Sequence, residues 1–268
     1  MTSPPLHAVV YGPWKNRRTG GQTLGINPCP TLAGDCPPRC PICDHGLPET
    51  IPILTRANQR PSSGVVVTSA ARKIIELSKA GEKVRTILVA GPADPTLHPQ
   101  LKEITENLRD LRNKWFPKAA LALHTLGEGL DAPATRRALF IYDKPILRFE
   151  WGTAKTFTAM TGQKGTKLQE LAEGVRNVER LIVEARFVRG GPDNSTEAEV
   201  KAWIKRILDL SPREVQIMTV PGSAARKTGG PRPVTATRLE QISAQLSEQI
   251  SGVVTLVELE AQPAGESC

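Results

Sequence analysis

The stretch VRTILVAGPADPTLHPQLKEITENLRDLRNKWFPKAALALHT, residues 84–125, indicates the class of fold. It begins with a continuous apolar run at 84–91 and ends with another at 119–125, and such runs are typical of strands that are buried on both faces. Between the two runs, apolar side chains recur at helical spacing, at Leu101, Ile104, Leu108 and Leu111. The stretch therefore predicts a strand, a helix and a second strand, the unit from which parallel sheets are built.

The same alternation continues on both sides of this stretch. Mostly apolar, β-rich runs predict further strands at 23–27, 145–151, 180–188 and 213–220. Helical spacing predicts helices around 200–208 and 239–250, and Ser195 and Thr196 are suited to cap the first of these. Repeated βα units predict an α/β fold, either an open doubly wound sheet or a full or partial barrel. Both arrangements place a ligand at the C-terminal ends of the strands.

Two further segments stand apart from this alternation. The run VVTLVELE, residues 253–260, is expected to add an edge strand before a loose tail. The longest expected loop, residues 220–235, is rich in Gly, Pro and basic residues. A loop of that length is either a functional lid or a surface excursion.

Length and composition predict one soluble globular domain. The chain has 268 residues, of which 39% are hydrophobic and 23% are charged. No apolar run approaches the roughly 20 residues that a membrane helix needs, and the first residues lack the features of a signal peptide. We therefore expect a cytoplasmic protein with no membrane partner.

The charge of the chain suggests an anionic partner. Lysine and arginine outnumber the acidic residues by 35 to 27, which gives a net charge of +8. Such a balance favours RNA or a phosphorylated substrate, although a merely basic surface explains it equally well.

Three cysteines crowd into GDCPPRCPICDHG, residues 34–46, at Cys36, Cys40 and Cys43. Without an export signal, this spacing suits a metal better than a disulfide framework. Structural zinc needs four protein ligands, so Cys29 or His45 would have to complete the set. A four-iron cluster held by three thiolates instead leaves one iron open to an external ligand. Both metals remain possible from the spacing alone, and the loop follows the strand predicted at 23–27, where a ligand site is expected.

The cysteine spacing and several flanking segments resemble the radical S-adenosylmethionine (radical SAM) superfamily. The lead-in VYGPWKNRRTGGQTLGINPCP, residues 10–30, resembles the branch that includes relatives of the tRNA wyosine-forming enzymes and iron–sulfur oxidoreductases. Four later segments of the chain are also similar to that branch, namely LVAGPADPTLHPQL, EWGTAKTFTAMTG, FVRGGPDNSTEAEV and SPREVQIMTV. The resemblance extends over roughly residues 9–245.

The resemblance implies a partial (β/α)6 barrel with a four-iron, four-sulfur cluster on Cys36, Cys40 and Cys43. S-adenosylmethionine would chelate the open iron, and one electron from a donor such as flavodoxin or ferredoxin would cleave it to a 5′-deoxyadenosyl radical that abstracts a substrate hydrogen. The core would span residues 11–250 with the cluster loop at 29–46. An N-terminal extension would precede it at 1–10, and a C-terminal strand and tail would follow at 251–268.

Further cofactor contacts follow from the same resemblance. Ile42 replaces the family's aromatic residue near the adenine. The segment Gly91 to Asp94, with Ala93, stands where the family often has Gly-Glu, so Asp94 would accept a hydrogen bond from the methionyl amino group. A simple strand-to-helix turn is the alternative for this segment. Glu150 stands where the family has Asp and would meet the cofactor ribose or the substrate.

Other polar residues have weaker claims to a role. We expect no salt bridge between Glu150 and Arg148, on the view that strand neighbours point to opposite faces. His98 is expected to structure the PTLHP turn, and His124 to lie at a strand end where it faces the cavity. Cys29 and Cys268 are expected to remain thiols outside the cluster.

The densest basic group near the expected barrel mouth is Lys15, Arg17 and Arg18. These side chains are suited to hold a carboxylate or phosphate of the substrate, and a solvated basic turn is the alternative.

Two classes of function follow. The first is a radical SAM enzyme acting on a small molecule, a cofactor precursor, a modified nucleoside such as a tRNA base, or a protein glycine. The second is a zinc- or cluster-stabilised RNA-binding protein. The missing fourth ligand and the position of the loop at a strand end favour the enzyme.

Overall fold

The computed structural model describes residues 8–16, 21–30, 60–91, 93–220 and 231–257. These residues form two compact units. The N-terminal unit includes the described residues up to Ile146, and the C-terminal unit includes those from Leu147 onward.

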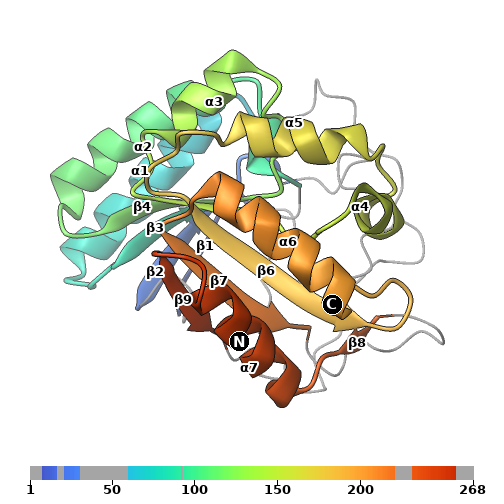
Figure 1. Cartoon of the computed structure of the whole chain (residues 1–268). Coiled ribbons are helices and arrows are strands. Elements are labelled where there is room, and N and C mark those ends of the chain that lie inside the picture. Colours follow the sequence, from blue (N-terminus) through green and yellow to red (C-terminus); the bar gives the residue numbers. More distant parts are fainter. Residues whose placement is uncertain (1–7, 17–20, 31–59, 92, 221–230, 258–268) are drawn as a thin grey trace. The chain divides into compact units, whose positions relative to one another are not determined.

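The N-terminal unit is a sheet of four strands with helices between them. Strand β1 is antiparallel to β2, and β2, β3 and β4 are parallel neighbours in that order. Helices α1 and α2 lie side by side along this sheet (Figure 1). The bounds of the elements are β1 Val10–Lys15, β2 Gln22–Ile26, α1 Ser63–Lys79, β3 Thr86–Val89, the 3-10 helix η2 Pro95–Leu97, α2 Leu101–Trp115, β4 Ala120–Thr125 and α3 Pro133–Leu139.

The C-terminal unit repeats the same kind of connection. Strand β6 is parallel to β7, β7 is parallel to β9, and the short β8 is antiparallel to β6. Strand β5 crosses the boundary between the two units. The bounds are β5 Lys144–Arg148, α4 Ala154–Thr161, α5 Thr166–Gly174, β6 Ile182–Arg189, α6 Glu197–Leu210, β7 Glu214–Thr219, β8 Arg232–Pro233, α7 Ala236–Ser247 and β9 Val253–Leu256.

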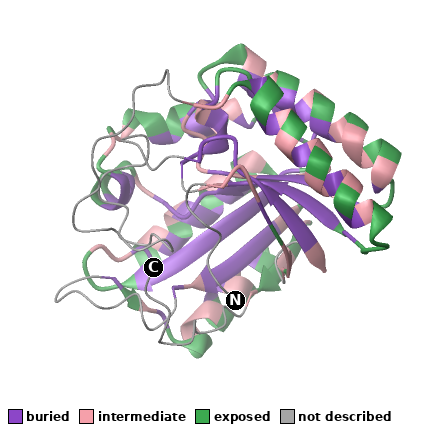
Figure 2. Cartoon of the chain, turned by 180° about the vertical axis from the view of Figure 1, so that it is seen from behind, coloured by how far each residue is buried: buried purple, intermediate pink, exposed green. Residues whose placement is uncertain are grey.

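The strands form the buried part of each unit. Figure 2 shows the strands mostly buried and the helices buried along one side, as expected when helices cover a sheet. In the register of the N-terminal sheet, Ile26, Val89 and Leu123 lie on one face and all have 0% exposure. This confirms the predicted α/β class with a mostly parallel, unclosed sheet.

Strand β1 is the described strand of the N-terminal sheet that the sequence did not predict, and helices α1, α3, α4 and α5 were not predicted either. The Tyr11 ring lies over Gly25, where a Cβ would come within 2.2 Å of the ring. The Tyr11 hydroxyl donates to the carbonyl of Ala90 at 3.1 Å, and its ring stacks on Trp14 at 5.2 Å between centroids. These contacts fix an antiparallel strand whose Gly-Pro interruption hides it in the sequence.

Most of the other predicted elements are confirmed within a few residues. Strand β9 is parallel to β7 and, among the described strands, pairs on that side alone, as expected of an edge strand. Thr196 is the N-cap of α6, and its side chain accepts from the amide of Glu199. The division of the chain at residues 10 and 250 stays a prediction.

Among the residues that the structure describes, no helix has the length and apolar composition needed to cross a bilayer.

Candidate functional site

The C-terminal ends of β2, β3 and β4 meet at one edge of the N-terminal sheet, because the three strands are parallel. The chain leaves the three strands at this edge through Asn27, Gly91 and Leu126. The chain continues from β2 toward the cysteine loop. Cys36, Cys40, Cys43 and Ile42 lie outside the described residues.

Asn27 fixes the chain where it leaves β2. Its side chain is 1% exposed, and its Oδ1 accepts a hydrogen bond from the amide of Cys29 at 3.1 Å. Gly91 leaves the space for this side chain, since a Cβ there would lie 2.1 Å from Oδ1. Cys29 is buried and forms no disulfide with a described residue. The absence of a side chain at Gly91 therefore makes room for Asn27, and Asn27 binds the backbone at Cys29, where the cysteine loop starts.

Asp94 is the most heavily hydrogen-bonded side chain at this edge, and it is 5% exposed. Its Oδ1 accepts from the Thr96 amide at 2.9 Å, the Thr96 hydroxyl at 2.8 Å and the Thr125 hydroxyl at 2.7 Å. Its Oδ2 accepts from the amides of Leu126 at 2.8 Å and Glu128 at 3.1 Å. The carboxylate therefore joins the turn after β3 to the loop after β4.

Two neighbours tighten the same junction. The Thr96 hydroxyl also accepts from the Gly129 amide at 3.0 Å. A Cβ on Gly129 would lie 2.0 Å from the carbonyl oxygen of Thr96, so the two loops touch through their backbones. Ala93, which precedes Asp94, is 1% exposed. The contact of Asp94 with a cofactor amino group stays a prediction. Its observed contacts connect the turn after β3 to the loop after β4.

His98 structures the turn that follows, as the sequence analysis expected. Its Nε2 lies 2.9 Å from the carbonyl oxygen of Pro61, and its Nδ1 accepts from the Gln100 amide at 3.1 Å. This pair of contacts assigns the proton to Nε2. His124 lies near the end of β4 and is half-buried.

His98 predicts a pH dependence of stability. Burial is the main cause that lowers the pKa of His98 below its ordinary 6.5, with a smaller opposing effect of the Pro61 carbonyl. The unfolded chain therefore binds a proton at a higher pH than the folded chain does, and stability falls as the pH drops from 6.5 through the folded pKa. Urea unfolding at pH 7.5 and 5.5 should show this loss. The slope should flatten in His98→Gln, and an equal slope in both proteins would contradict the assignment.

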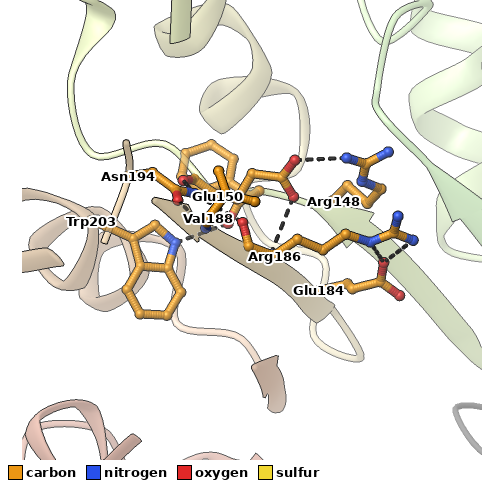
Figure 3. A network of polar contacts seen from close by, with 8 residues as sticks. Arg148, Glu150, Glu184, Arg186, Val188, Asn194 and Trp203 are labelled. Atoms are coloured by element: carbon orange, nitrogen blue, oxygen red, sulfur yellow. Dashed lines mark hydrogen bonds and ion pairs between the residues drawn. The ribbon is translucent and has the colours of Figure 1, made fainter. Parts of the chain in front are cut away.

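The C-terminal unit contains a buried network of charges around Glu150 (Figure 3). Glu150 is 1% exposed, its Oε1 accepts from Arg148 at 2.7 Å, and its Oε2 lies 3.4 Å from the backbone N–H of Arg186. Arg186, on β6, binds Glu184 through Nε at 3.0 Å and a terminal nitrogen at 2.9 Å. Glu184 and Arg186 are 0% and 1% exposed.

This network replaces the strand pairing that β5 no longer provides. The last ladder bond runs from the Phe149 amide to the carbonyl of Glu184 at 2.9 Å. Beyond it, Asn194 donates to the carbonyls of Glu150 and Arg186, both at 2.9 Å, and accepts from the Val188 amide at 2.7 Å. The Trp203 indole donates to the Phe149 carbonyl at 2.9 Å. Side chains thus satisfy the backbone groups where β6 extends past β5, as buried polar groups require.

The salt bridge between Arg148 and Glu150 corrects our expectation from the sequence. Residues two apart on a strand lie on the same face, since only adjacent residues alternate. At 2.7 Å the pair is in direct contact, and the Glu150 side chain is fully buried. The proposed contact of Glu150 with a ribose or substrate is not tested by this geometry.

The basic group near the N-terminus is described only in part. Lys15 is exposed at the end of β1, and Arg17 and Arg18 lie outside the described residues. Among the described residues, no group of three or more His, Cys, Asp or Glu side chains is arranged to hold a metal. The residues proposed to hold a cluster, Cys36, Cys40 and Cys43, therefore lie outside the part of the chain in which this search was made.

Sequence reasoning missed three residues of the site. Thr125 donates to Asp94, and Asn194 and Trp203 belong to the network around Glu150. The signal for the network around Glu150 was present, since Glu184 and Arg186 interrupt an otherwise apolar run at 181–188. Charges inside a buried strand require partners. No comparable signal in the sequence identified Thr125 as a hydrogen-bond donor to Asp94.

Comparisons with known proteins give distant structural matches. No family model matches the sequence, and no curated protein matches it. A domain of pyruvate-formate lyase-activating enzyme from Bacteroides vulgatus matches with 11% identity and a TM-score of 0.47, covering 65% of this chain and 99% of that one. Coproporphyrinogen III oxidase (HemN) from Escherichia coli, described as a radical SAM enzyme, matches with 13% identity and a TM-score of 0.47, covering 69% of this chain and 46% of that one. The predicted wyosine-like branch stays a prediction.

Proposed function

We propose that this protein is a radical SAM enzyme. The observation that supports this most directly is the Cys36-x3-Cys40-x2-Cys43 spacing in the segment that follows β2 in the sequence, and β2 ends at the C-terminal edge of a parallel sheet. Three thiolates hold three irons of a four-iron cluster and leave the fourth for S-adenosylmethionine. When bound, the two groups would supply a 5′-deoxyadenosyl radical for hydrogen abstraction.

The residues of the chain would position these groups and exclude water. Asn27 and Gly91 orient the start of the cysteine loop through the contact with the Cys29 amide. Ile42 would contact the adenine. Gly91 and Ala93 would present backbone groups to the cofactor beside the cysteine loop.

The test is anaerobic reconstitution of the whole chain with iron and sulfide. We expect a brown protein with about four irons per chain, which cleaves S-adenosylmethionine to 5′-deoxyadenosine when dithionite supplies the electron. A flavodoxin or ferredoxin should replace dithionite. A protein that binds one zinc and no sulfide, and cleaves nothing, would instead support the RNA-binding alternative.

For the substrate, we propose an anionic small molecule or nucleoside held by Lys15, Arg17 and Arg18, as the net charge of +8 favours. Replacing both arginines by Gln should raise the KM of that substrate while cleavage of S-adenosylmethionine continues. Each lost charged hydrogen bond is worth about 1.5–3 kcal/mol.

Salt dependence separates RNA from a small anion. Binding of a tRNA should weaken steeply between 50 and 200 mM salt, because each neutralised phosphate releases counterions. Binding that is insensitive to salt would exclude a large RNA surface.

Unchanged product formation in the variant with Arg17 and Arg18 both replaced by Gln would assign the arginines to the solvated surface.

A further inference from the structure

We propose that Asp94 is a positioning residue, which locks the turn after β3 to the loop after β4 and does not bind the cofactor amino group. The inference rests on the proposed function, because it concerns which groups at this edge meet S-adenosylmethionine. It reverses the role that the family resemblance implies for this side chain.

The first argument is the number of donors. A carboxylate has about four lone-pair sites, and five donors lie within 3.1 Å of the Asp94 oxygens. An ammonium group would have to displace at least one of them. Three of the five donors are backbone amides, of Thr96, Leu126 and Glu128, and a displaced amide would need a new partner at this edge.

The second argument is the length of the side chain. The carboxylate reaches both loops with one methylene, and the Asp94 side chain caps η2 by accepting from the Thr96 amide. The neighbouring Ala93 and Thr96 are 1% and 3% exposed, so the junction is closed around it. A glutamate at this position could not make the same set of bonds without shifting one loop. The closure therefore explains an aspartate where the family often has glutamate.

The third argument is what the lock holds in place. Gly91 lies three residues before Asp94 and packs against Asn27, which orients the start of the cysteine loop. On the other side, the lock fixes the backbone of 126–128 directly after β4. Asp94 thus determines the spacing between two backbone segments at the edge where S-adenosylmethionine is proposed to bind, and these segments supply the polar contacts.

The experiment compares Asp94→Glu, Thr125→Val and wild type by amide hydrogen exchange and by binding of S-adenosylmethionine to the reconstituted protein. Thr125→Val removes one donor to Asp94 and no charge. We expect exchange at the amides of Leu126 and Glu128 to rise at least about tenfold in Asp94→Glu and less in Thr125→Val. The affinity for S-adenosylmethionine should fall several-fold in both variants, with the iron content unchanged.

Two controls separate positioning from loss of stability. Tyr142→Phe removes another buried hydrogen bond of the same unit, from the hydroxyl 2.8 Å from that of Thr105, and should lower the melting temperature without changing the affinity. Asp131→Asn changes an exposed carboxylate in the loop after β4 and should change neither. An equal loss of affinity in Tyr142→Phe would reduce Asp94 to a stability residue and overturn the proposal.

Direct binding of the amino group predicts the opposite result. In that case Asp94→Glu restores the family's residue and keeps or improves the affinity, while Thr125→Val leaves it unchanged, and either result would overturn the positioning role. If reconstituted wild type binds no S-adenosylmethionine, the proposed function fails and the ligand half of this inference fails with it. The exchange rates decide the structural half by themselves, and unchanged protection of Leu126 and Glu128 in Asp94→Glu would refute the lock.

Discussion

Replacing any one of Cys36, Cys40 or Cys43 by Ala is expected to remove the iron–sulfur cluster and all cleavage of S-adenosylmethionine. Each thiolate would hold a different iron, so no remaining ligand compensates for the lost one. Iron and sulfide analysis of the anaerobically reconstituted variants, together with the yield of 5′-deoxyadenosine, measures the effect. Activity should drop to the level of the unreconstituted protein.

The other two cysteines provide matched controls. Cys29→Ala and Cys268→Ala should keep the full iron content and activity, because neither belongs to the triad. Cys29 is the sharper control, since it is buried near the end of β2 and precedes the triad by seven residues. Loss of the cluster in Cys29→Ala would make Cys29 a fourth ligand and point to a closed cluster with no open iron. Full iron content in any triad variant would refute the cluster assignment.

The strands of this fold were predictable because most of them are buried on both faces. Their apolar runs are continuous, and the register that brings Leu24, Ile87 and Leu121 together puts fully buried side chains on neighbouring strands. Strand β1 lacks such a run, and its place depends on the contact of Tyr11 with Gly25, which joins residues of two strands. Periodicity within one segment contains no information on that contact.

The candidate site was predictable in position and less so in the role of each residue. The βα pattern alone places the ends of β2 and β3 at one edge, where Asn27 and Gly91 are found. Three of the five hydrogen bonds to Asp94 come from residues 31 to 34 positions away, at the end of β4 and just after it. Local sequence cannot show that a carboxylate is already saturated by distant donors.

The strand end at Glu150 shows the same limit. The apolar run predicted a strand to residue 151, whereas β5 ends at Arg148. The run continues because Phe149 and Trp151 are buried, although only the amide of Phe149 still bonds to β6, at the carbonyl of Glu184. A hydrophobic run indicates that its residues are buried and does not show where their backbone groups bond. The carbonyls of Phe149 and Glu150 accept from the side chains of Trp203 and Asn194.

Arg186→Met is expected to destabilise the protein by about 3–5 kcal/mol, the usual cost of removing one partner of a buried ion pair. Arg186 gives Glu184 two hydrogen bonds, at 3.0 and 2.9 Å, and the Glu184 side chain has no exposed surface. The methionine fills a similar volume, so the loss should come from the carboxylate and not from a cavity. Anaerobic urea unfolding gives the free energy.

The double variant Glu184→Leu, Arg186→Met should recover most of this loss. Removing both charges also removes the cost of burying them, so the pair replaced by apolar side chains is expected to be close to wild type in stability. The two single variants and the double variant form a cycle that isolates the coupling between the charges. A coupling below about 1 kcal/mol would show that other groups or water stabilise the Glu184 carboxylate.

An exposed pair tests whether burial is the cause. Lys102 and Glu106 on α2 lie 2.9 Å apart with side chains 43% and 40% exposed. Lys102→Met should change the stability by at most about 0.5 kcal/mol, because water solvates the remaining carboxylate. In both variants a methionine replaces the basic partner of a carboxylate, so a difference of several kcal/mol would come mainly from desolvation of the remaining carboxylate. Similar effects at the two sites would mean that the buried charges of the β6 face are stabilised no differently from a pair in water.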